Sequence, residues 1–220
     1  MAPRPLIALL LLVSSIGAGA GAASPTGCVP LDDFSRGRPG EFPPEWKPRK
    51  ESGRPAYSIR EEGGRRFLRG VARRLGIQAG REVTWDLEAY PILAWSWRPI
   101  EFPKDSDERK STTNDSAVSV YAVFPTSPVS VKSVKYTWSR VVPAGTHLMS
   151  SAGNTQVRVL RSGAQAGQWV DERVNLREDY RKYFGGSEVP KPAGIAVLTD
   201  SDDTGSSAQG DYANFRACPP

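Results

Sequence analysis

The densest group of oxygen donors in the chain is an acidic segment near its C-terminal end, which reads Asp-Ser-Asp-Asp-Thr-Gly from residue 200. Carboxylate oxygens on a tight loop are ligands that Ca²⁺ prefers. The segment is not an EF-hand, because its twelfth position is Asp211 and not the bidentate Glu. It predicts either a structural Ca²⁺ site or a polar turn whose aspartates accept backbone hydrogen bonds. If the ends of the domain lie side by side, the ligands of that Ca²⁺ would be Asp200, Asp202, Asp203, Asp32, Asp33 and Asp211.

Aromatic side chains form a second candidate site. Trp95 and Trp97 alternate with other residues in one apolar stretch, and Tyr136 and Trp138 do so in another. Alternate positions of a strand share one face, so each pair of rings points the same way. Flat rings stack on the apolar face of a pyranose, and Arg173 could add a polar contact. Tryptophans at alternate positions of central strands more commonly fill the space between two packed sheets. The pattern therefore predicts either a sugar-binding platform or a core.

Two carboxylates form a third candidate. Asp115 and Glu172 could act as the acid and base of a polysaccharide hydrolase if they faced one cleft. Arg173 follows Glu172 directly and would more simply form ion pairs where a strand meets a helix. His147 is the single histidine and stands in a turn with no nucleophile motif beside it. We expect no catalytic residue, with the Asp115–Glu172 hydrolase as the alternative.

Composition narrows the chemistry further. The 220 residues include one His and two Cys, which exclude a Cys/His zinc site, an iron–sulfur cluster and a multi-histidine metal centre. No cofactor is expected apart from the structural Ca²⁺ considered above. The 21 Gly and 19 Pro indicate many turns, and hence short strands more than long helices.

The elements that must position these residues are mostly strands. Short stretches of alternating or continuous apolar residues recur along the chain and predict strands at 83–87, 92–98, 115–124, 133–138, 156–160, 169–174, 194–198 and 211–215. The loop between Lys104 and Thr113 is expected to be mobile. One helix is predicted near 176–184, because Asn175 suits its N-cap, Glu178 completes a capping box, and Gly185 ends it. This pattern predicts an all-β, jelly-roll-like β-sandwich with one short helix.

The charge is concentrated in the N-terminal part. Residues 36–81 hold 13 Lys and Arg against 5 Asp and Glu. Within them, residues 65–75 could form a basic amphipathic helix, but the apolar stretch 56–59, the Glu-Glu-Gly-Gly sequence at 61–64 and Gly70 favour a hairpin of two strands over 56–75. We expect a cationic, solvated face whose partner, if it has one, is an acidic polysaccharide or an anionic lipid and not a nucleic acid.

The first 23 residues read as a signal peptide. Arg4 precedes a short apolar run from Leu6 to Val13, which is too short to span a membrane, and small residues follow it. The domain is then expected at 24–220. Export would place Cys28 and Cys218 in an oxidising compartment, which favours a disulfide between the two ends of the domain. The alternative is a lipoprotein anchored at Cys28.

Several motifs resemble those of one family when they are taken in order. They are 31–34 (LDDF), 93–98 (LAWSWR), 114–115 (ND), 136–139 (YTWS), 172–180 (ERVNLREDY), 184–185 (FG) and 194–205 (GIAVLTDSDDTG). Together they resemble the bacterial exported family called domain of unknown function 3047, over nearly all of the chain after the signal segment. The resemblance implies a β-sandwich similar to carbohydrate-binding modules, a periplasmic or secreted location, and no known activity.

The function we expect is that of an exported, non-catalytic binding module, with a glycan or an anionic polymer of the cell envelope as its ligand. This expectation rests on analogy between folds. Two alternatives stay open. One is the hydrolase described above, and the other is a structural protein of the envelope without a small ligand.

Overall fold

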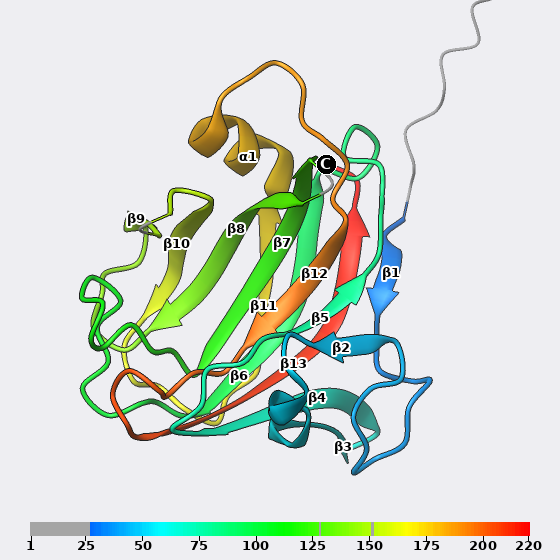
Figure 1. Cartoon of the computed structure of the whole chain (residues 1–220). Coiled ribbons are helices and arrows are strands. Elements are labelled where there is room, and N and C mark those ends of the chain that lie inside the picture. The colour runs from blue at the N-terminus through cyan, green and yellow to red at the C-terminus, as the bar shows by residue number, and fades with distance from the viewer. Residues whose placement is uncertain (1–26, 128, 151) are drawn as a thin grey trace, which may run out of the picture.

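Two β-sheets make up most of the structure, a computed structural model that describes residues 27–127, 129–150 and 152–220 (Figure 1). The predicted signal peptide lies outside these residues. One sheet has six strands, which are, in spatial order, β11 (Val170–Asn175), β6 (Ile92–Glu101), β13 (Ser207–Cys218), β4 (Arg65–Arg73) and β3 (Tyr57–Glu62), with β1 (Val29–Asp32) also pairing with β13. The other has seven, which are β2 (Trp46–Pro48), β5 (Ala79–Glu82), β12 (Gly194–Leu198), β7 (Val118–Ser127), β8 (Ser130–Ser139), β10 (Thr155–Ser162) and β9 (His147–Met149).

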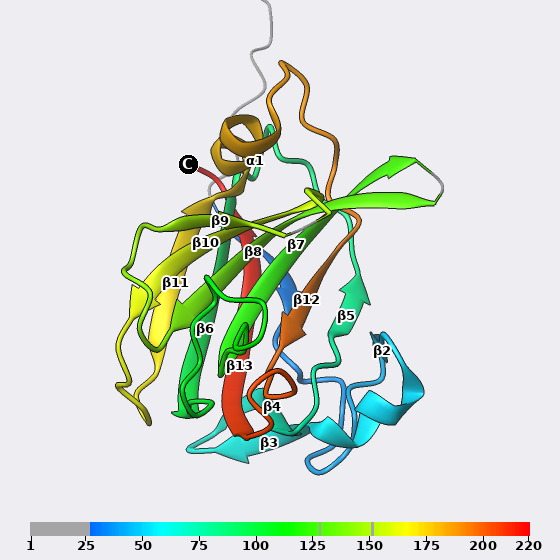
Figure 2. The ribbon, with the colours of Figure 1, turned by 60° about the vertical axis from the view of Figure 1, so that its left-hand side comes forward.

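The two sheets face each other as a β-sandwich, which confirms the predicted fold class (Figure 2). The core lies between them because alternate residues of each strand point inward. From β6, Leu93, Trp95 and Trp97 enter this core, and from β8, Val134 and Tyr136 do so. All five are fully buried. The pairing is antiparallel except between β8 and β10, which run parallel.

The ends of the described chain meet in the six-stranded sheet. Strand β1 pairs antiparallel with β13, with Val29 opposite Ala217. Cys28 and Cys218 form a disulfide across this pair, which confirms the predicted bond between two residues separated by 190 positions. The last strand therefore lies inside the sheet, between β4 and β6, and is also joined covalently to the first.

The predicted helix is confirmed as α1 (Leu176–Phe184), at one end of the sandwich in Figure 1. The Asn175 side chain accepts a hydrogen bond from the backbone N–H of Glu178 at 3.1 Å, and Gly185 follows the last turn with φ of 72°. The apolar face of α1 covers the end of the core, where the rings of Tyr180 and Phe124 lie 4.6 Å apart. None of the helices in the described residues is long and apolar enough to cross a membrane.

The basic segment 56–75 forms a hairpin, as predicted. Strands β3 and β4 pair antiparallel, and Gly63 and Gly64 make the turn with positive φ values of 57° and 77°. Glycine takes such values at no steric cost. A 3₁₀ helix, η1 (Glu51–Ala56), leads into this hairpin.

One local prediction was wrong. The strand expected at 83–87 is a loop, because pairing with β12 ends at Glu82, although Trp85 and Leu87 are still buried. The loop from Lys104 to Thr113, which is predicted to be mobile, contains a backbone hydrogen bond from Asp107 N–H to Thr113 O at 2.8 Å. It also buries the side chain of Glu108.

Candidate functional site

The structure places the four predicted platform rings inside the protein. Trp95, Trp97 and Tyr136 have no exposed surface, and Trp138 is 5% exposed. Neighbouring rings pack at centroid distances of 5.3 Å for Trp95–Trp97 and 6.2 Å for Trp97–Trp138. The prediction of a sugar-stacking platform at these residues was wrong, because both strands turn this face toward the opposite sheet. Arg173 lies apart from them, exposed on β11.

The predicted hydrolase pair is also separated. Glu172 lies on β11, in the six-stranded sheet, and accepts hydrogen bonds from Trp97 Nε1 at 3.1 Å and Arg161 Nε at 2.6 Å. Asp115 precedes β7 of the other sheet and accepts from the hydroxyl of Thr204 at 2.6 Å. The prediction that Asp115 and Glu172 work as a pair was wrong, because the two carboxylates start from different sheets and are held by separate partners, Glu172 by Trp97 and Arg161 and Asp115 by Thr204.

The six predicted Ca²⁺ ligands fall into several places. Asp32 pairs with Arg81 at 2.7 Å, and Asp33 accepts a hydrogen bond from the backbone N–H of Ser35. Asp211, on β13, is held by two arginines. These three aspartates are therefore engaged elsewhere, and their inclusion in one calcium site was wrong.

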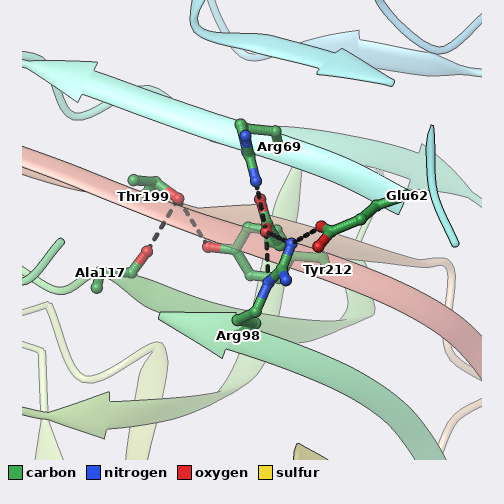
Figure 3. Close-up of polar contacts among 7 residues, drawn as sticks. Glu62, Arg69, Arg98, Ala117, Thr199 and Tyr212 are labelled. Carbon is green, nitrogen blue, oxygen red and sulfur yellow. Dashed lines mark hydrogen bonds and ion pairs between the residues drawn. The ribbon is translucent and has the colours of Figure 1, made fainter. Parts of the chain in front are cut away.

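The partners of Asp211 belong to a network of polar contacts (Figure 3). Arg69 Nε donates to Asp211 Oδ1 at 2.7 Å, and Arg98 Nε donates to Oδ2 at 2.9 Å. Glu62 accepts from Arg98 at 2.7 Å. The side chains come from β3, β4, β6 and β13, so the network crosses four strands of the six-stranded sheet.

The residues that remain from the acidic segment meet a carboxylate from another part of the chain. Asp200 and Asp202 lie with Asp115, and one oxygen of each falls within 4.8 Å of the others. Asp203 is exposed and donates its backbone N–H to Asp115 at 3.3 Å. We call Asp115, Asp200 and Asp202 the acidic cluster.

Beside this cluster, the outer face of the seven-stranded sheet is hollowed. On β7 and β12, Tyr121, Ala196 and Leu198 form a small apolar group outside the main core. Their chain neighbours, such as Val120 and Val197, belong to the main core, so the outer group must point away from the opposite sheet. Lys135 on β8 occupies an outward position for the same reason, since Val134 and Tyr136 point inward.

A polar hollow of about 290 Å³ opens over this face. Tyr121, Lys135 and Leu198 contribute to its floor, and Val157 from β10 extends the floor toward the sheet edge. Its lining also includes residues outside the sheet strands, among them Arg49, Gly76, Gln78, Glu108 and Asn114.

The charged groups of the polar hollow include a buried lysine and a buried glutamate. Lys135 is 5% exposed and Glu108 is 8% exposed. Burial acts to lower the pKa of Lys135, but the nearby Tyr121, Asp200 and Glu108 outweigh it and raise that pKa. Lys135 therefore carries a positive charge at neutral pH. Its Nζ lies 5.7 Å from the centre of the Tyr121 ring.

Glu108 has one oxygen in use and one without a partner. Its Oε2 accepts a hydrogen bond from the Ser139 hydroxyl, whereas Oε1 is buried and has no partner among the described residues. Burial raises the pKa of the Glu108 carboxyl. Burial is the largest cause that raises the pKa of Asp200 to about 8. Burial therefore disfavours the charged form of both carboxyl groups at this end of the hollow.

A second hollow of about 300 Å³ adjoins the first over β2, β5 and β12. The two hollows share Arg49 and Gln78 and so adjoin each other, and we call the two together the outer-face groove. The second hollow is mainly apolar, with Val123, Ile195 and Ala196 among its lining residues. The groove thus combines an apolar part with a polar, charged end.

Reasoning from the sequence missed this groove. The alternation of 133–138 already placed Lys135 on the face opposite Tyr136, but the binding prediction rested on the aromatic face. Glu108 was missed because its loop was expected to be mobile. Arg49 and Gln78 lie outside every predicted strand, and no sequence signal joins them to β8.

Comparison with known proteins gives a family and a fold. Residues 44–216 match the family described as "Protein of unknown function (DUF3047)". No curated protein sequence matches the chain. Among solved structures, the family 11 carbohydrate-binding module of the Clostridium thermocellum cellulase Lic26A-Cel5E is 9% identical with a TM-score of 0.51, and the alignment covers 90% of this chain and 97% of that one.

A second structure of a family 11 module from Clostridium thermocellum contains a β-1,3-1,4-mixed-linked tetrasaccharide. It is 10% identical with a TM-score of 0.50, and the alignment covers 89% of this chain and 98% of that one. At such identities the likeness establishes the β-sandwich fold of a carbohydrate-binding module.

Proposed function

The chain belongs to the DUF3047 family, whose function is unknown, and we propose that it is an exported, non-catalytic glycan-binding module whose ligand lies in the outer-face groove. A glycan of the cell envelope, neutral or anionic, is the ligand class we favour. The mature protein would be periplasmic or secreted.

One observation carries this proposal, namely the pairing of a buried donor with an unpartnered buried acceptor at the polar end of the groove. Lys135 offers ammonium hydrogens, and Glu108 Oε1 has no donor among the described residues. A buried polar atom without a partner costs about 1–3 kcal/mol. A sugar hydroxyl both donates and accepts, so one hydroxyl or a row of them satisfies both groups.

The apolar part of the groove suits the C–H faces of a pyranose ring. Tyr121 and Leu198 form an apolar floor next to Lys135, and Val123 and Ala196 continue it into the second hollow. Apolar C–H faces of pyranose rings would cover these side chains while their hydroxyls reach the polar wall. Ligand sites commonly combine a mostly apolar lining with a few placed polar groups.

Export is supported by chemistry in the described part of the chain and by the sequence before it. The Cys28–Cys218 disulfide fits an oxidising compartment. The expected signal peptide, residues 1–23, agrees with that location.

The test is affinity electrophoresis of the purified mature protein in gels that contain single polysaccharides. The panel would include mixed-linkage β-glucan, xyloglucan, xylan, an anionic glycan and solubilised peptidoglycan. We expect retardation by at least one of them. The variant Arg49→Ala should bind about tenfold more weakly, because it removes one charge-assisted hydrogen bond of about 1.5 kcal/mol. Arg49 is exposed, so the variant should fold.

Controls separate the groove from general charge. Arg60→Ala removes an exposed arginine from β3 of the other sheet and should bind like the wild type. Lys135→Met should abolish binding, whereas Lys132→Met should not, because Lys132 lies over the Phe184 ring. An equal loss of affinity in Arg49→Ala and Arg60→Ala, or in Lys135→Met and Lys132→Met, would contradict binding in the outer-face groove. If no polysaccharide retards the protein, the proposed glycan-binding function is wrong and a structural role is favoured. If the protein releases reducing sugar from a polysaccharide, a hydrolase is favoured.

A further inference from the structure

The acidic cluster at the end of the groove brings three carboxylates close together, and glycan binding does not explain this arrangement. From the geometry we infer that Asp115, Asp200 and Asp202 bind one divalent cation of the Ca²⁺ type. The inference does not depend on the proposed function, because it concerns the protein without a glycan.

The spacing of the three carboxylates fits one cation. An oxygen from each lies within 4.8 Å of the others. Ca²⁺ binds oxygen at about 2.3–2.6 Å, so an ion between the three oxygens reaches all of them. Asp202 is exposed, which leaves water access for the remaining coordination positions that Ca²⁺ requires.

A second observation points to a missing partner at this place. Asp200 is 8% exposed, and its Oδ1 is buried with no hydrogen-bond partner among the described residues. None of the ion pairs in the described part of the chain involves Asp115, Asp200 or Asp202. Buried carboxylates are costly unless they are paired or bind a metal. A cation would supply the partner that Asp200 Oδ1 lacks.

Gly76 keeps the space beside these oxygens clear. A Cβ at this position would stand 2.4 Å from Asp200 Oδ1 and 2.6 Å from Asp202 Oδ1. Real Cβ atoms do not approach other atoms so closely, so any larger residue would push the two carboxylates apart. Gly76 does not adopt a positive φ, so its backbone conformation does not require glycine. The absence of a side chain is what leaves space for the carboxylates of Asp200 and Asp202.

The loop that carries the cluster is already ordered by other contacts. Asp200 donates its N–H to Ser116 O at 2.9 Å, and Ser201 donates to Leu75 O at 3.1 Å. The Asp115 carboxylate is oriented by the backbone N–H and the hydroxyl of Thr204, at 2.7 and 2.6 Å. Such supporting bonds hold metal ligands in place. The carboxylate oxygens are thus presented without a large rearrangement.

The chemistry of the donors selects a hard cation. All three side chains are carboxylates, which favour Ca²⁺, Mg²⁺ or Mn²⁺ over metals that prefer nitrogen or sulfur. Ca²⁺ accepts irregular geometry and many oxygen ligands, whereas Mg²⁺ requires a near-ideal octahedron. We therefore expect Ca²⁺ to bind more tightly than Mg²⁺.

The experiment is isothermal titration calorimetry of the chelator-treated full mature protein with CaCl₂, and then with MgCl₂ and MnCl₂. We expect one Ca²⁺ per chain and a melting temperature that rises with Ca²⁺ concentration. Asp202→Asn should weaken Ca²⁺ binding by about tenfold or more. Because Asp202 is exposed, this variant should fold like the wild type.

Two further variants complete the test. Gly76→Ala should also weaken Ca²⁺ binding, although it removes no ligand. Asp33→Asn is the matched control. Asp33 is exposed, lies near the other end of the chain, and accepts a hydrogen bond from the backbone N–H of Ser35. It should leave the affinity unchanged. No heat of binding with any of the three ions in the wild type, or the same Ca²⁺ affinity in Asp202→Asn, would overturn the inference. Neither result bears on polysaccharide retardation, so the two proposals fail separately.

Discussion

At the scale of single residues, Lys135 and Glu108 show how burial sets the state of a polar group. Both are nearly inaccessible, yet they differ in what surrounds them. Lys135 keeps its charge because carboxylates and Tyr121 face it. The pKa of the Glu108 carboxyl is raised because burial disfavours its charged form. The outer-face groove therefore has a fixed positive group beside a carboxyl that titrates above its usual range.

The raised pKa of Glu108 predicts a change of stability with pH. Since the folded protein binds this proton more tightly than the unfolded chain, the stabilisation is fully present below the ordinary value of 4.5. It is lost as the pH rises through the folded-state pKa. Glu108→Gln cannot ionise, so its free energy of unfolding should fall less than that of the wild type between pH 5 and 8.

Urea denaturation at several pH values, in the presence of chelator, measures this difference. The control is Glu41→Gln, because Glu41 is exposed and its change should leave the wild-type slope intact. A Glu108→Gln protein with the full wild-type slope would show that Glu108 does not carry it.

At the scale of elements, side chains join strands that the chain places far apart. Arg69 on β4 and Arg98 on β6 both hold the fully buried Asp211 on β13 (Figure 3). On the other side of β13, the hydroxyl of Tyr212 lies 2.9 Å from that of Thr199, which itself donates to Ala117 O at 3.0 Å. Strand β13 is thus fixed on one face to its neighbours in the sheet and on the other to the opposite sheet.

The Asp211 network predicts a large effect from one substitution. Asp211→Asn removes a buried carboxylate between two arginines and should lower the free energy of unfolding by about 3 kcal/mol, because unpaired charge is left beside the core. Glu62→Gln also touches Arg98, but the Glu62 side chain is 60% exposed and screened by solvent, so its loss should lower the free energy of unfolding far less than Asp211→Asn does. Urea denaturation of both variants gives the comparison. A similar loss of unfolding free energy in Asp211→Asn and Glu62→Gln would contradict the prediction that the buried Asp211 holds the network.

At the scale of the whole molecule, the fold is closed by its ends. Strand β1 pairs with β13, and the disulfide between Cys28 and Cys218 spans 190 positions of the chain. Antiparallel pairing also joins β13 to β4 and β6, and β12 to β5 and β7, across long stretches of intervening chain. Such a chain loses much conformational entropy before its contacts form, so a covalent link between its ends has a large effect.

Reduction of the disulfide should therefore destabilise the protein without changing its fold. A loop of this length corresponds to about 5 kcal/mol in the chain-entropy model. We expect the urea midpoint to fall in the presence of reductant, and Cys28→Ser with Cys218→Ser to behave like the reduced wild type. Equal midpoints for the oxidised and reduced proteins would show that β1–β13 pairing alone carries this stability. A control in which reductant is added to the double variant should show no change.

The sequence by itself determined the features that depend on near neighbours. Alternation of apolar residues located β6 and β8, a continuous apolar run located β7, and the Asn175 cap with Gly185 located α1. Compartment chemistry favoured the Cys28–Cys218 bond. These features follow from the two-residue period of a strand, from a helix end, and from the chemistry of cysteine, each of which is local or compositional.

Only the tertiary structure decided which side chains meet. The same alternation that located β8 could not say whether the face of Trp138 or that of Lys135 was the outer one, because that depends on where the second sheet packs. Asp115 meets Asp200 through the placement of the ends of β7 and β12, which lie side by side in the sheet. Strand register over long separations follows from the sum of many contacts, so no short segment of the chain encodes it.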